Sequence, residues 1–376
     1  MNQNESRPRI REVGINIGNM SPGVKNHIGD VGNISIGHTT IIKSEGKLIP
    51  GKGPIRTGVT VVLPHRGDIF HKKVPAAAYI MNGFGKATGI PQIMELGNIE
   101  TPIAITNTLN VGIVWDAIIE WILNKNPFIG ITEGSVSPIV TECNDGYFND
   151  IRGRHVKASH VLDALEKAEK INDYAEGVVG AGTGMRAFDL KSGVGSSSRI
   201  IQTENNRFTV GALSVPNYGN LADLMILGIP VGKELINKNF LEKTKKRTTQ
   251  GSIISIIATD APVTFRQLLR IAKRAVIGIA RTGSIIGSTS GDFIIAFSTA
   301  NIIDWNSKNE IESYKVIEKD GDIINQLFRA TIEATEESIL NALFKACTLT
   351  GRDDRILKAI PIDETITILH KHKIIW

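Results

Sequence analysis

Cysteine is scarce in this chain, and the residue types that bind metals are not grouped. The 376 residues include two cysteines, Cys143 and Cys347, which stand far apart and outside any CxxC pair. This spacing indicates neither a zinc knuckle nor a disulfide framework. The eight histidines stand singly, and no HExxH motif is present. The sequence therefore predicts a protein that holds no metal ion and needs no other cofactor.

Long apolar runs and a strong excess of one charge are also missing. No segment reaches the roughly 20 apolar residues of a membrane-spanning helix, and the best candidate, Leu109–Leu123, carries Asp116 and Glu120. Lys and Arg number 43 against 38 Asp and Glu, a net charge of +5, and they are scattered. Nucleic acid and membrane are therefore not expected as partners. The first residues lack the apolar segment of a secretory signal, so we expect a cytoplasmic protein.

Segments with helical and strand patterns are mixed along the rest of the chain. The composition, 41% hydrophobic and 22% charged, is typical of a globular protein with a sizeable core. Residues 1–55 are interpreted as loops and short strands. Strands are predicted at 57–64, 101–106, 137–141, 207–215, from 252, at 291–301 and at 365–369. Helices are predicted at 110–123, 155–170, 260–281 and about 322–347, with Asn110 and Asp260 as candidate caps. This mixture predicts α/β or α+β layers.

A glycine-rich stretch, 177–199, contains the run GAGTG at Gly180–Gly184. It lacks the GxGxxG spacing of a dinucleotide loop, and no Lys-Ser or Lys-Thr pair directly follows its last glycine, as a phosphate-binding loop requires. We interpret it as tight backbone turns beside a cleft.

The junction Gly251-Ser252 is the most informative local feature. Residues 238–251 are polar and basic and predict a flexible linker, whereas Ser252 opens the apolar run SIISIIATDAP. A small residue before a hydroxyl residue suits an N-to-O acyl shift, in which the serine hydroxyl attacks the preceding carbonyl. Cleavage would leave Ser252 with a free α-amine, a usable base near neutral pH because its pKa is about 7.7–8.0. Taken alone, Gly-Ser is a common loop dipeptide, and the spacing favours an ordinary surface loop.

Longer motifs favour a cleavage site at Gly251-Ser252 over an ordinary surface loop. The runs GSIISIIATDAPVTFRQLLRIAKRA and IARTGSIIGSTSGDFIIAFSTAN are accompanied, in order, by GPIRTGVTVVLPH, NGFGKATGI, TPIAITNTLNVG, TECNDGYFNDI, VGAGTGM with SGVGSSSR, and ACTLTGRDDR. Together they resemble the DmpA-type family of L-aminopeptidase/D-amidase-esterases, which includes the β-peptidyl aminopeptidases. The resemblance spans nearly the whole chain.

The resemblance implies a fold and an activity. The fold would be a four-layer α/β/β/α sandwich, similar to the N-terminal-nucleophile hydrolases in architecture but not in strand connectivity. One catalytic domain would cleave itself into chains 1–251 and 252–376, which stay together, and a homotetramer of these α/β heterodimers is expected. The activity would be removal of amino-terminal residues from short peptides, amides or esters that carry a free amino terminus.

The family's functional residues fall on matching positions of this sequence. The resemblance implies Ser252 as nucleophile and Gly251 as the residue before the cut. It places a second serine at Ser290 and an acidic residue at Asp292, where some relatives have glutamate. It further implies that Asn217 and Tyr147 hold the developing oxyanion and that Glu142 receives the substrate's ammonium group.

Four of these residues can also be interpreted as purely structural. Ser290 and Asp292, two residues apart in an extended chain, are expected to project to the same side, or to form only a polar turn. Asn217, beside Pro216, is also typical of a turn, and Tyr147 of a strand edge.

Three other functions are compatible with parts of the pattern. Ornithine acetyltransferase has a similar architecture and also cleaves itself, but it uses threonine, and Ser252 and its flanking motifs argue against it. A second alternative is a self-processing protein without peptidase activity. The third is a structural protein that is never cut.

Overall fold

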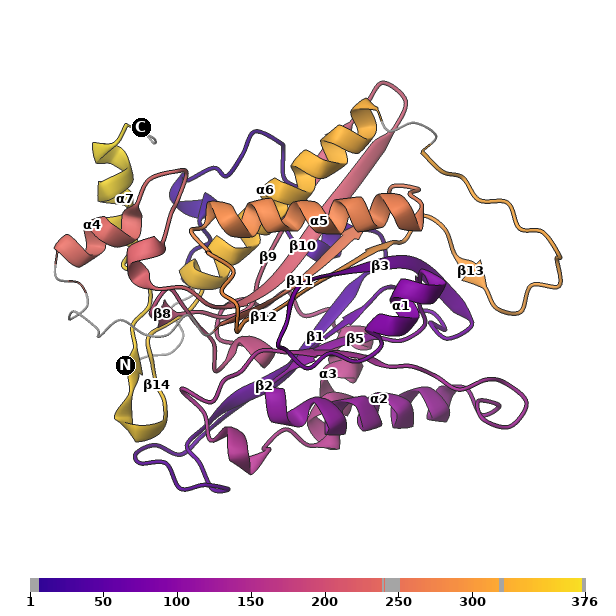
Figure 1. The fold of residues 1–376 in the computed structure, drawn as a ribbon, viewed down its shortest axis with the longest axis horizontal. Helices are drawn as coiled ribbons and strands as arrows, with labels where there is room; N and C mark the ends of the chain where they lie inside the picture. Colours follow the sequence, from indigo (N-terminus) through magenta and orange to yellow (C-terminus); the bar gives the residue numbers. More distant parts are fainter. Residues whose placement is uncertain (1–6, 239, 241–250, 318–320, 374–376) are drawn as a thin grey trace.

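Two β-sheets lie face to face, and a pair of long helices covers the outer side of each (Figure 1). This arrangement is that of the computed structural model, which describes residues 7–238, 240, 251–317 and 321–373. The layers confirm the predicted four-layer α/β/β/α sandwich.

The smaller sheet has the strand order β1-β2-β5-β6. Its strands are β1 (Ser35–Lys43), β2 (Ile55–Leu63), β5 (Ile103–Thr106) and β6 (Ile139–Glu142). Helices α2 (Val111–Lys125) and α3 (Ala158–Lys170) cover its outer face. All nine residues of β2 are buried, because the helices lie on one side of it and the other sheet lies on the opposite side. β5 and β6 are parallel and joined through α2, the crossover that parallel strands require.

The larger sheet has the order β13-β3-β12-β11-β10-β9, with the short β4 (Asn98–Ile99) also paired to β3. Its strands are β13 (Ile303–Asp304), β3 (Lys72–Gly83), β12 (Gly291–Ser298), β11 (Ser252–Thr259), β10 (Arg207–Asn217) and β9 (Gly195–Gln202). Helices α5 (Phe265–Arg281) and α6 (Asp322–Phe344) cover its outer face. β11 therefore lies in the middle of the sheet, antiparallel to β10 and parallel to β12.

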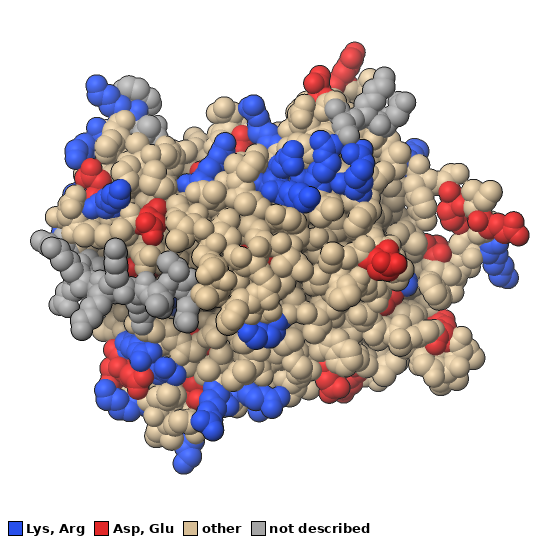
Figure 2. Space-filling model, in the orientation of Figure 1, with Lys and Arg blue, Asp and Glu red and all other residues tan. Residues whose placement is uncertain are grey.

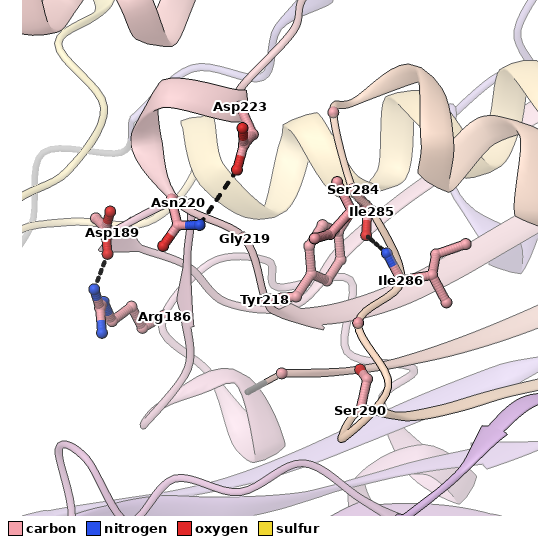
Figure 3. A pocket seen from close by; sticks show the side chains of 13 residues that line it. Arg186, Asp189, Tyr218, Gly219, Asn220, Asp223, Ser284, Ile285, Ile286 and Ser290 are labelled. Atoms are coloured by element: carbon pink, nitrogen blue, oxygen red, sulfur yellow. Dashed lines mark hydrogen bonds and ion pairs between the residues drawn. The ribbon is translucent and has the colours of Figure 1, made fainter. Parts of the chain in front are cut away.

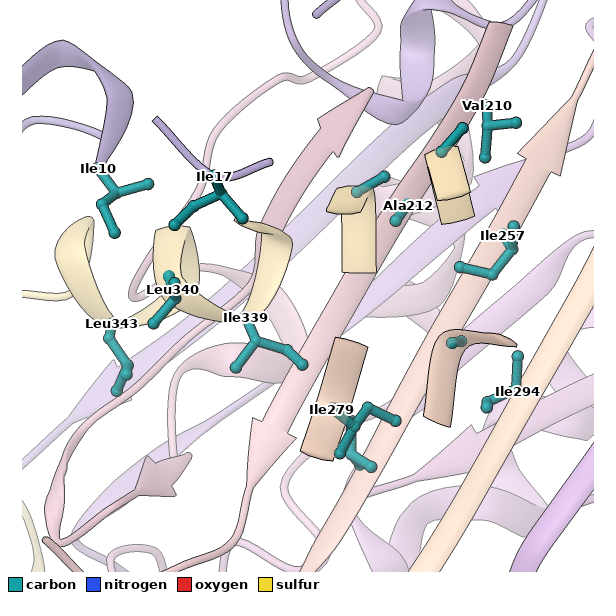
Figure 4. Packing of buried hydrophobic residues seen from close by; sticks show 14 of the residues in the cluster. Ile10, Ile17, Val210, Ala212, Ile257, Ile279, Ile294, Ile339, Leu340 and Leu343 are labelled. Atoms are coloured by element: carbon teal, nitrogen blue, oxygen red, sulfur yellow. The ribbon is translucent and has the colours of Figure 1, made fainter. Parts of the chain in front are cut away.

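Alternation along β11 divides its side chains between two cores. Ile253 and Ile257 pack against the helices, together with Ile279 of α5 and residues of α6 (Figure 4). Ile254, Ile256 and Ala258 point the other way, into the core between the two sheets. Because successive side chains of a strand project to opposite faces, Ser252 has the same orientation as Ile254. The strand thus directs Ser252 into the space between the sheets.

The outer face of α5 is basic, as its sequence pattern predicts. Arg266 and Lys273 are exposed, and Arg270 and Arg274 are half-buried. Figure 2 shows Lys and Arg side chains gathered over this helical layer.

The remaining elements are short. They are α1 (Ile90–Leu96), α4 (Val231–Asn237), α7 (Ile362–Lys371), and two ribbons, β7 (Arg186–Ala187) with β8 (Leu190–Lys191) and β14 (Leu349–Thr350) with β15 (Ile356–Leu357). Within the described part of the chain, no helix is both long and apolar enough to cross a membrane.

Most predicted elements are present, but the strand predicted at 365–369 is wrong. These residues lie in α7, where Thr365, Ile368 and Leu369 are buried at helical spacing. The alternation of Thr and Ile in this segment is typical of a strand, but Pro361 and the acidic residues Asp363 and Glu364 favour the start of a helix.

Both predicted helix caps also need correction. The helix expected from Asp260 begins at Phe265, where Thr264 accepts a hydrogen bond from the Gln267 N–H. Asp260 instead accepts a hydrogen bond from Thr209 N at 2.6 Å. Asn110 precedes α2, but its side chain makes no capping bond.

The structure also has long strands that the sequence pattern did not reveal. β1 lies in the region interpreted as loops and short strands, β9 begins within the glycine-rich stretch, and β3 was not predicted. The predicted linker, 238–251, lies largely outside the described residues, which include only its positions 238, 240 and 251.

Candidate active site

Ser252 lies at the floor of a cleft of about 610 Å³. It is the first residue of β11, directly opposite Asn217 of β10 and Gly291 of β12. Its side chain is only 4% exposed. The cleft is lined by Phe84, Gly85, Lys86, Thr108, Glu142, Asn144, Gly146, Tyr147, Gly184, Arg186, Asn217, Tyr218, Gly219, Gly251, Ser252, Thr289, Gly291, Arg352 and Arg355. It thus brings together four of the residues predicted for the site: Ser252, Asn217, Tyr147 and Glu142.

Ser290 lines a separate cavity of about 60 Å³ (Figure 3). This second cavity adjoins the cleft and shares Arg186, Tyr218, Gly219 and Gly251 with it, but Ser252 lines only the cleft. Asp292 is paired in register with Ile253, whose side chain packs on the helical side of the sheet. The predicted pair therefore lies behind the strand end, while the Ser252 side chain faces the cleft.

The side chains of Ser290 and Asp292 do meet. Ser290 Oγ donates to Asp292 Oδ1 at 2.6 Å, and the same oxygen accepts from Ile253 N at 3.1 Å. The other carboxylate oxygen accepts from Asn82 Nδ2 at 3.0 Å. Burial raises the pKa of Asp292, and the three hydrogen bonds oppose that rise because they favour the charged form. The carboxylate consequently holds the Ile253 N–H, which belongs to the peptide group directly after Ser252 in strand β11, in place.

Asn217 directs its amide toward the Ser252 hydroxyl. Its Nδ2 lies 3.4 Å from Ser252 Oγ and donates to Asn144 O at 2.9 Å. Its Oδ1 accepts from Arg186 N at 3.1 Å, which fixes the orientation of the amide. A donor held in this way suits the stabilisation of negative charge near Ser252.

A buried lysine supports the backbone that orients Asn217. Lys191 is fully buried, and its ammonium group donates to the carbonyls of Gly182 (3.2 Å), Met185 (3.0 Å) and Ser192. The Met185 carbonyl belongs to the same peptide unit as the Arg186 N–H that binds Asn217. Burial lowers the pKa of Lys191 to about 7. The lysine is thus linked through one peptide group and Asn217 to Ser252.

Glu142 ends β6 and is 3% exposed at the wall of the cleft. One carboxylate oxygen accepts from Lys86 N at 2.9 Å, and the other accepts from the Thr108 hydroxyl. Both are neutral donors, so neither contact pairs the carboxyl group with a cation, and its remaining lone pairs are open to one.

Tyr147 follows β6 in a loop at the cleft. Its ring lies between two guanidinium groups, 4.8 Å from Arg186 and 4.7 Å from Arg355. Arg355 Nη1 also donates to the Tyr147 carbonyl at 2.6 Å. The stacking fixes the direction of the aromatic ring.

Several neighbours of the site were not assigned a role from the sequence. The Cys143 thiol is fully buried next to Ser252, and burial raises its pKa far above the usual value, so it remains an uncharged thiol. Burial also raises the pKa of Asp145 to about 7, against the hydrogen bond that its carboxyl accepts from Asn149. Cys143, Asp145 and Arg355 all lie in motifs shared with the resembled family, but the sequence gives no sign of their contacts.

The site is built without a cluster of metal ligands. Among the described residues, no group of three or more His, Cys, Asp or Glu side chains is placed to hold a metal ion.

Comparison with known proteins identifies the family. The profile of peptidase family S58 matches residues 26–357. The chain belongs to peptidase family S58. It is thus a hydrolase of an aminopeptidase family whose nucleophile is an amino-terminal serine. Beta-peptidyl aminopeptidase BapA of Sphingosinicella microcystinivorans is 39% identical over 378 residues, covering 97% of this chain and 93% of that protein.

Two solved structures show the same fold. The PH0078 protein of Pyrococcus horikoshii OT3 is 50% identical, with a TM-score of 0.92 and coverage of 97% of this chain and 99% of the other. The L-aminopeptidase D-Ala-esterase/amidase of Ochrobactrum anthropi, a prototype of the serine aminopeptidases, is 31% identical, with a TM-score of 0.88 and coverage of 98% and 100%. Its fold is a variant of the Ntn hydrolase fold, so the family S58 chain described here has that variant fold as well.

Proposed function

We propose that this chain cleaves itself between Gly251 and Ser252 and then removes amino-terminal residues from short peptides or amides. The observation that carries this proposal is the position of Ser252. It opens a central, fully buried strand at the floor of a cleft whose wall holds a buried carboxylate, Glu142.

Self-cleavage is supported by the geometry around Gly251. Its carbonyl oxygen accepts a hydrogen bond from Gly291 N at 3.2 Å, which polarises the bond to be attacked. Ser252 Oγ would add to that carbonyl carbon, the C–N bond would break, and the nitrogen would take up a proton to become the free amine. Water would then hydrolyse the ester, leaving a Gly251 carboxylate and the Ser252 hydroxyl. A Cβ at position 251 would lie 2.7 Å from Tyr218 Cβ, so any larger residue would require the Tyr218 backbone to shift.

The same groups would serve the peptidase reaction. The new α-amine, with a pKa of about 7.7–8.0, would take the proton from the Ser252 hydroxyl as it attacks the substrate carbonyl. Asn217 Nδ2 would donate to the oxyanion, and we assign Tyr147 to the same region of the cleft. Glu142 would bind the substrate's ammonium group by a charge-assisted hydrogen bond. Ser290 and Asp292, behind the strand end, would hold the amine in position.

Processing and activity can be tested together. Purified wild-type protein should run as two bands on a denaturing gel, and the smaller chain should begin SIISI on Edman sequencing. Ser252→Ala should remain one band and be inactive. Alanyl p-nitroanilide should be hydrolysed and its N-acetylated form should not. One persistent full-length band in active enzyme would exclude the cleavage, and equal turnover of both anilides would exclude the amine requirement.

The oligomer is part of the same proposal. We expect a homotetramer of cut chains, which sedimentation velocity would distinguish from a single α/β heterodimer.

A further inference from the structure

Positive charge exceeds negative charge on the wall of the cleft around Ser252. Lys86, Arg186, Arg352 and Arg355 are cationic, whereas Glu142 is the one carboxylate among the described lining residues. Arg186 is neutralised by its ion pair with Asp189. The Lys86 ammonium donates to its neighbouring carbonyl, Phe84 O, at 2.8 Å. Lys86 keeps its charge, and the other two cations are the arginines of the 352–355 turn.

This turn is firmly attached to the loop that carries Tyr147. Arg352 N donates to Phe148 O at 3.0 Å, and Gly351 N donates to Arg355 O at 2.8 Å. Arg355 binds the Tyr147 carbonyl and stacks on its ring, as described above. The two guanidinium groups are consequently held at the cleft rather than extended into solvent.

Their hydrogen-bonding capacity is largely unused. Arg352 Nε is buried and makes no hydrogen bond to any described residue. Its distance to Asp353 Oδ2 is 3.7 Å, too long for a hydrogen bond. Arg355 Nη2 has only a 3.4 Å ion-pair contact with the same carboxylate oxygen. Both side chains also remain partly exposed, 22% for Arg352 and 32% for Arg355, so a ligand that brings acceptor oxygens can reach them from the cleft.

We infer that Arg352 and Arg355 form a subsite for the free C-terminal carboxylate of the substrate. A guanidinium group presents two parallel N–H donors that match the two oxygens of a carboxylate. With Glu142 receiving the ammonium group, the cleft would recognise both charged ends of a short peptide. The preferred substrate class is thus dipeptides with a free carboxylate, rather than their amides. This inference rests on the proposed aminopeptidase function.

The experiment compares substrates that differ only at the C-terminal group. L-Alanyl-L-alanine and β-alanyl-L-alanine are each paired with the corresponding C-terminal amide, and the released amino acid is measured by chromatography. In the wild type, kcat/KM for at least one free acid should exceed that for its amide by about tenfold or more, the range of one charge-assisted hydrogen bond.

Two variants and a control locate the effect. Arg352→Gln should remove most of the preference by raising KM for the acid much more than it changes kcat/KM for the amide. Arg355→Gln should act in the same direction. Arg207→Gln, at an exposed position at the start of β10, makes the same charge change and should keep the preference.

The outcomes separate the two proposals. Cleavage of acids and amides with equal kcat/KM in the wild type would overturn the carboxylate subsite and leave the aminopeptidase function standing. A preference that survives in Arg352→Gln and Arg355→Gln would also overturn the subsite. If none of the four substrates is cleaved by processed enzyme, the proposed function itself fails, and the subsite with it.

Discussion

Replacing Asp292 by Asn tests how the amine end of β11 is held. The carboxylate accepts three hydrogen bonds, from Ser290 and Ile253 on one oxygen and from Asn82 on the other. Asn82 Nδ2 also donates to Gly287 O at 3.1 Å, so Asn82 cannot reverse its amide without losing that bond. An asparagine at 292 has one acceptor oxygen. Whichever way its amide lies, its NH₂ group must face at least one donor.

The expected loss of rate in Asp292→Asn follows from the number of hydrogen bonds that the substitution removes. At least one hydrogen bond to a charged group is lost, at a cost of about 1.5–3 kcal/mol. If the whole loss appears in the transition state, rates fall roughly 10- to 150-fold, since each 1.36 kcal/mol is a factor of ten. The proposed self-cleavage would precede the free amine but use the same strand end, so processing should slow as well.

The assay separates the two steps. The processed fraction is followed on denaturing gels over time, and kcat is measured per processed chain with alanyl p-nitroanilide. Asp116→Asn, at an exposed position of α2, is the matched control. Ser290→Ala should slow both steps too, and combining it with Asp292→Asn should add little, because the two residues act as one unit. Wild-type rates for both steps in Asp292→Asn would refute the reasoning and leave Ser290 and Asp292 as a polar turn.

Three further predictions concern the surroundings of Ser252. Glu142→Gln should mainly raise KM for alanyl p-nitroanilide in steady-state kinetics, because it weakens ammonium binding in ground state and transition state alike. Lys191→Met should lower kcat with KM unchanged in the same steady-state kinetics, because the peptide group that orients Asn217 loses its hydrogen bond from Lys191. Asp145 has a folded pKa of about 7 against an ordinary 3.8, so the folded state keeps its proton longer and stability falls as pH rises through that interval. Asp145→Asn should remove up to about 3 kcal/mol of the stability change between pH 4.5 and pH 8, measured by urea unfolding at those two pH values.

The mixture of helix and strand patterns predicted α/β or α+β layers, whereas the four-layer arrangement was expected only from the family resemblance. β11 contains the mostly apolar run SIISIIAT, β2 ends in the apolar run VTVVL, and α5 has a regular apolar stripe. β3 and β9 were missed because their sequences, KKVPAAAYIMNG and GSSSRIIQ, contain lysine, proline, alanine or serine where apolar β-branched residues are usual. Their pairing with β12 and β10 makes them strands. The strand predicted at 365–369 failed for the converse reason, since its residues suit a strand but pack as a helix.

The site was predictable as a set of residues but not as a geometry. The motifs placed Ser252, Asn217, Tyr147 and Glu142 together, and all four line one cleft. The expectation that Ser290 and Asp292 project to one side is confirmed by their hydrogen bond. Their location behind the strand end depends on the register of β12 against β11, which no local pattern encodes. The links from Lys191 to Asn217 likewise depend on a loop conformation.

The strand order of the large sheet determines what a cut at Gly251 would do to the refolding of the protein. β11 and β12 come from the segment after Gly251, yet they lie between β3 and β10, which come from the segment before it. Such a cut would release a new amino terminus but no fragment. Folding of the uncut precursor is a unimolecular process, whereas a denatured, processed enzyme would have to bring two separate chains together with interleaved strands. Recovery from denaturation would thus become concentration-dependent and prone to fail, so that the lifetime of the mature enzyme is set by how slowly it unfolds.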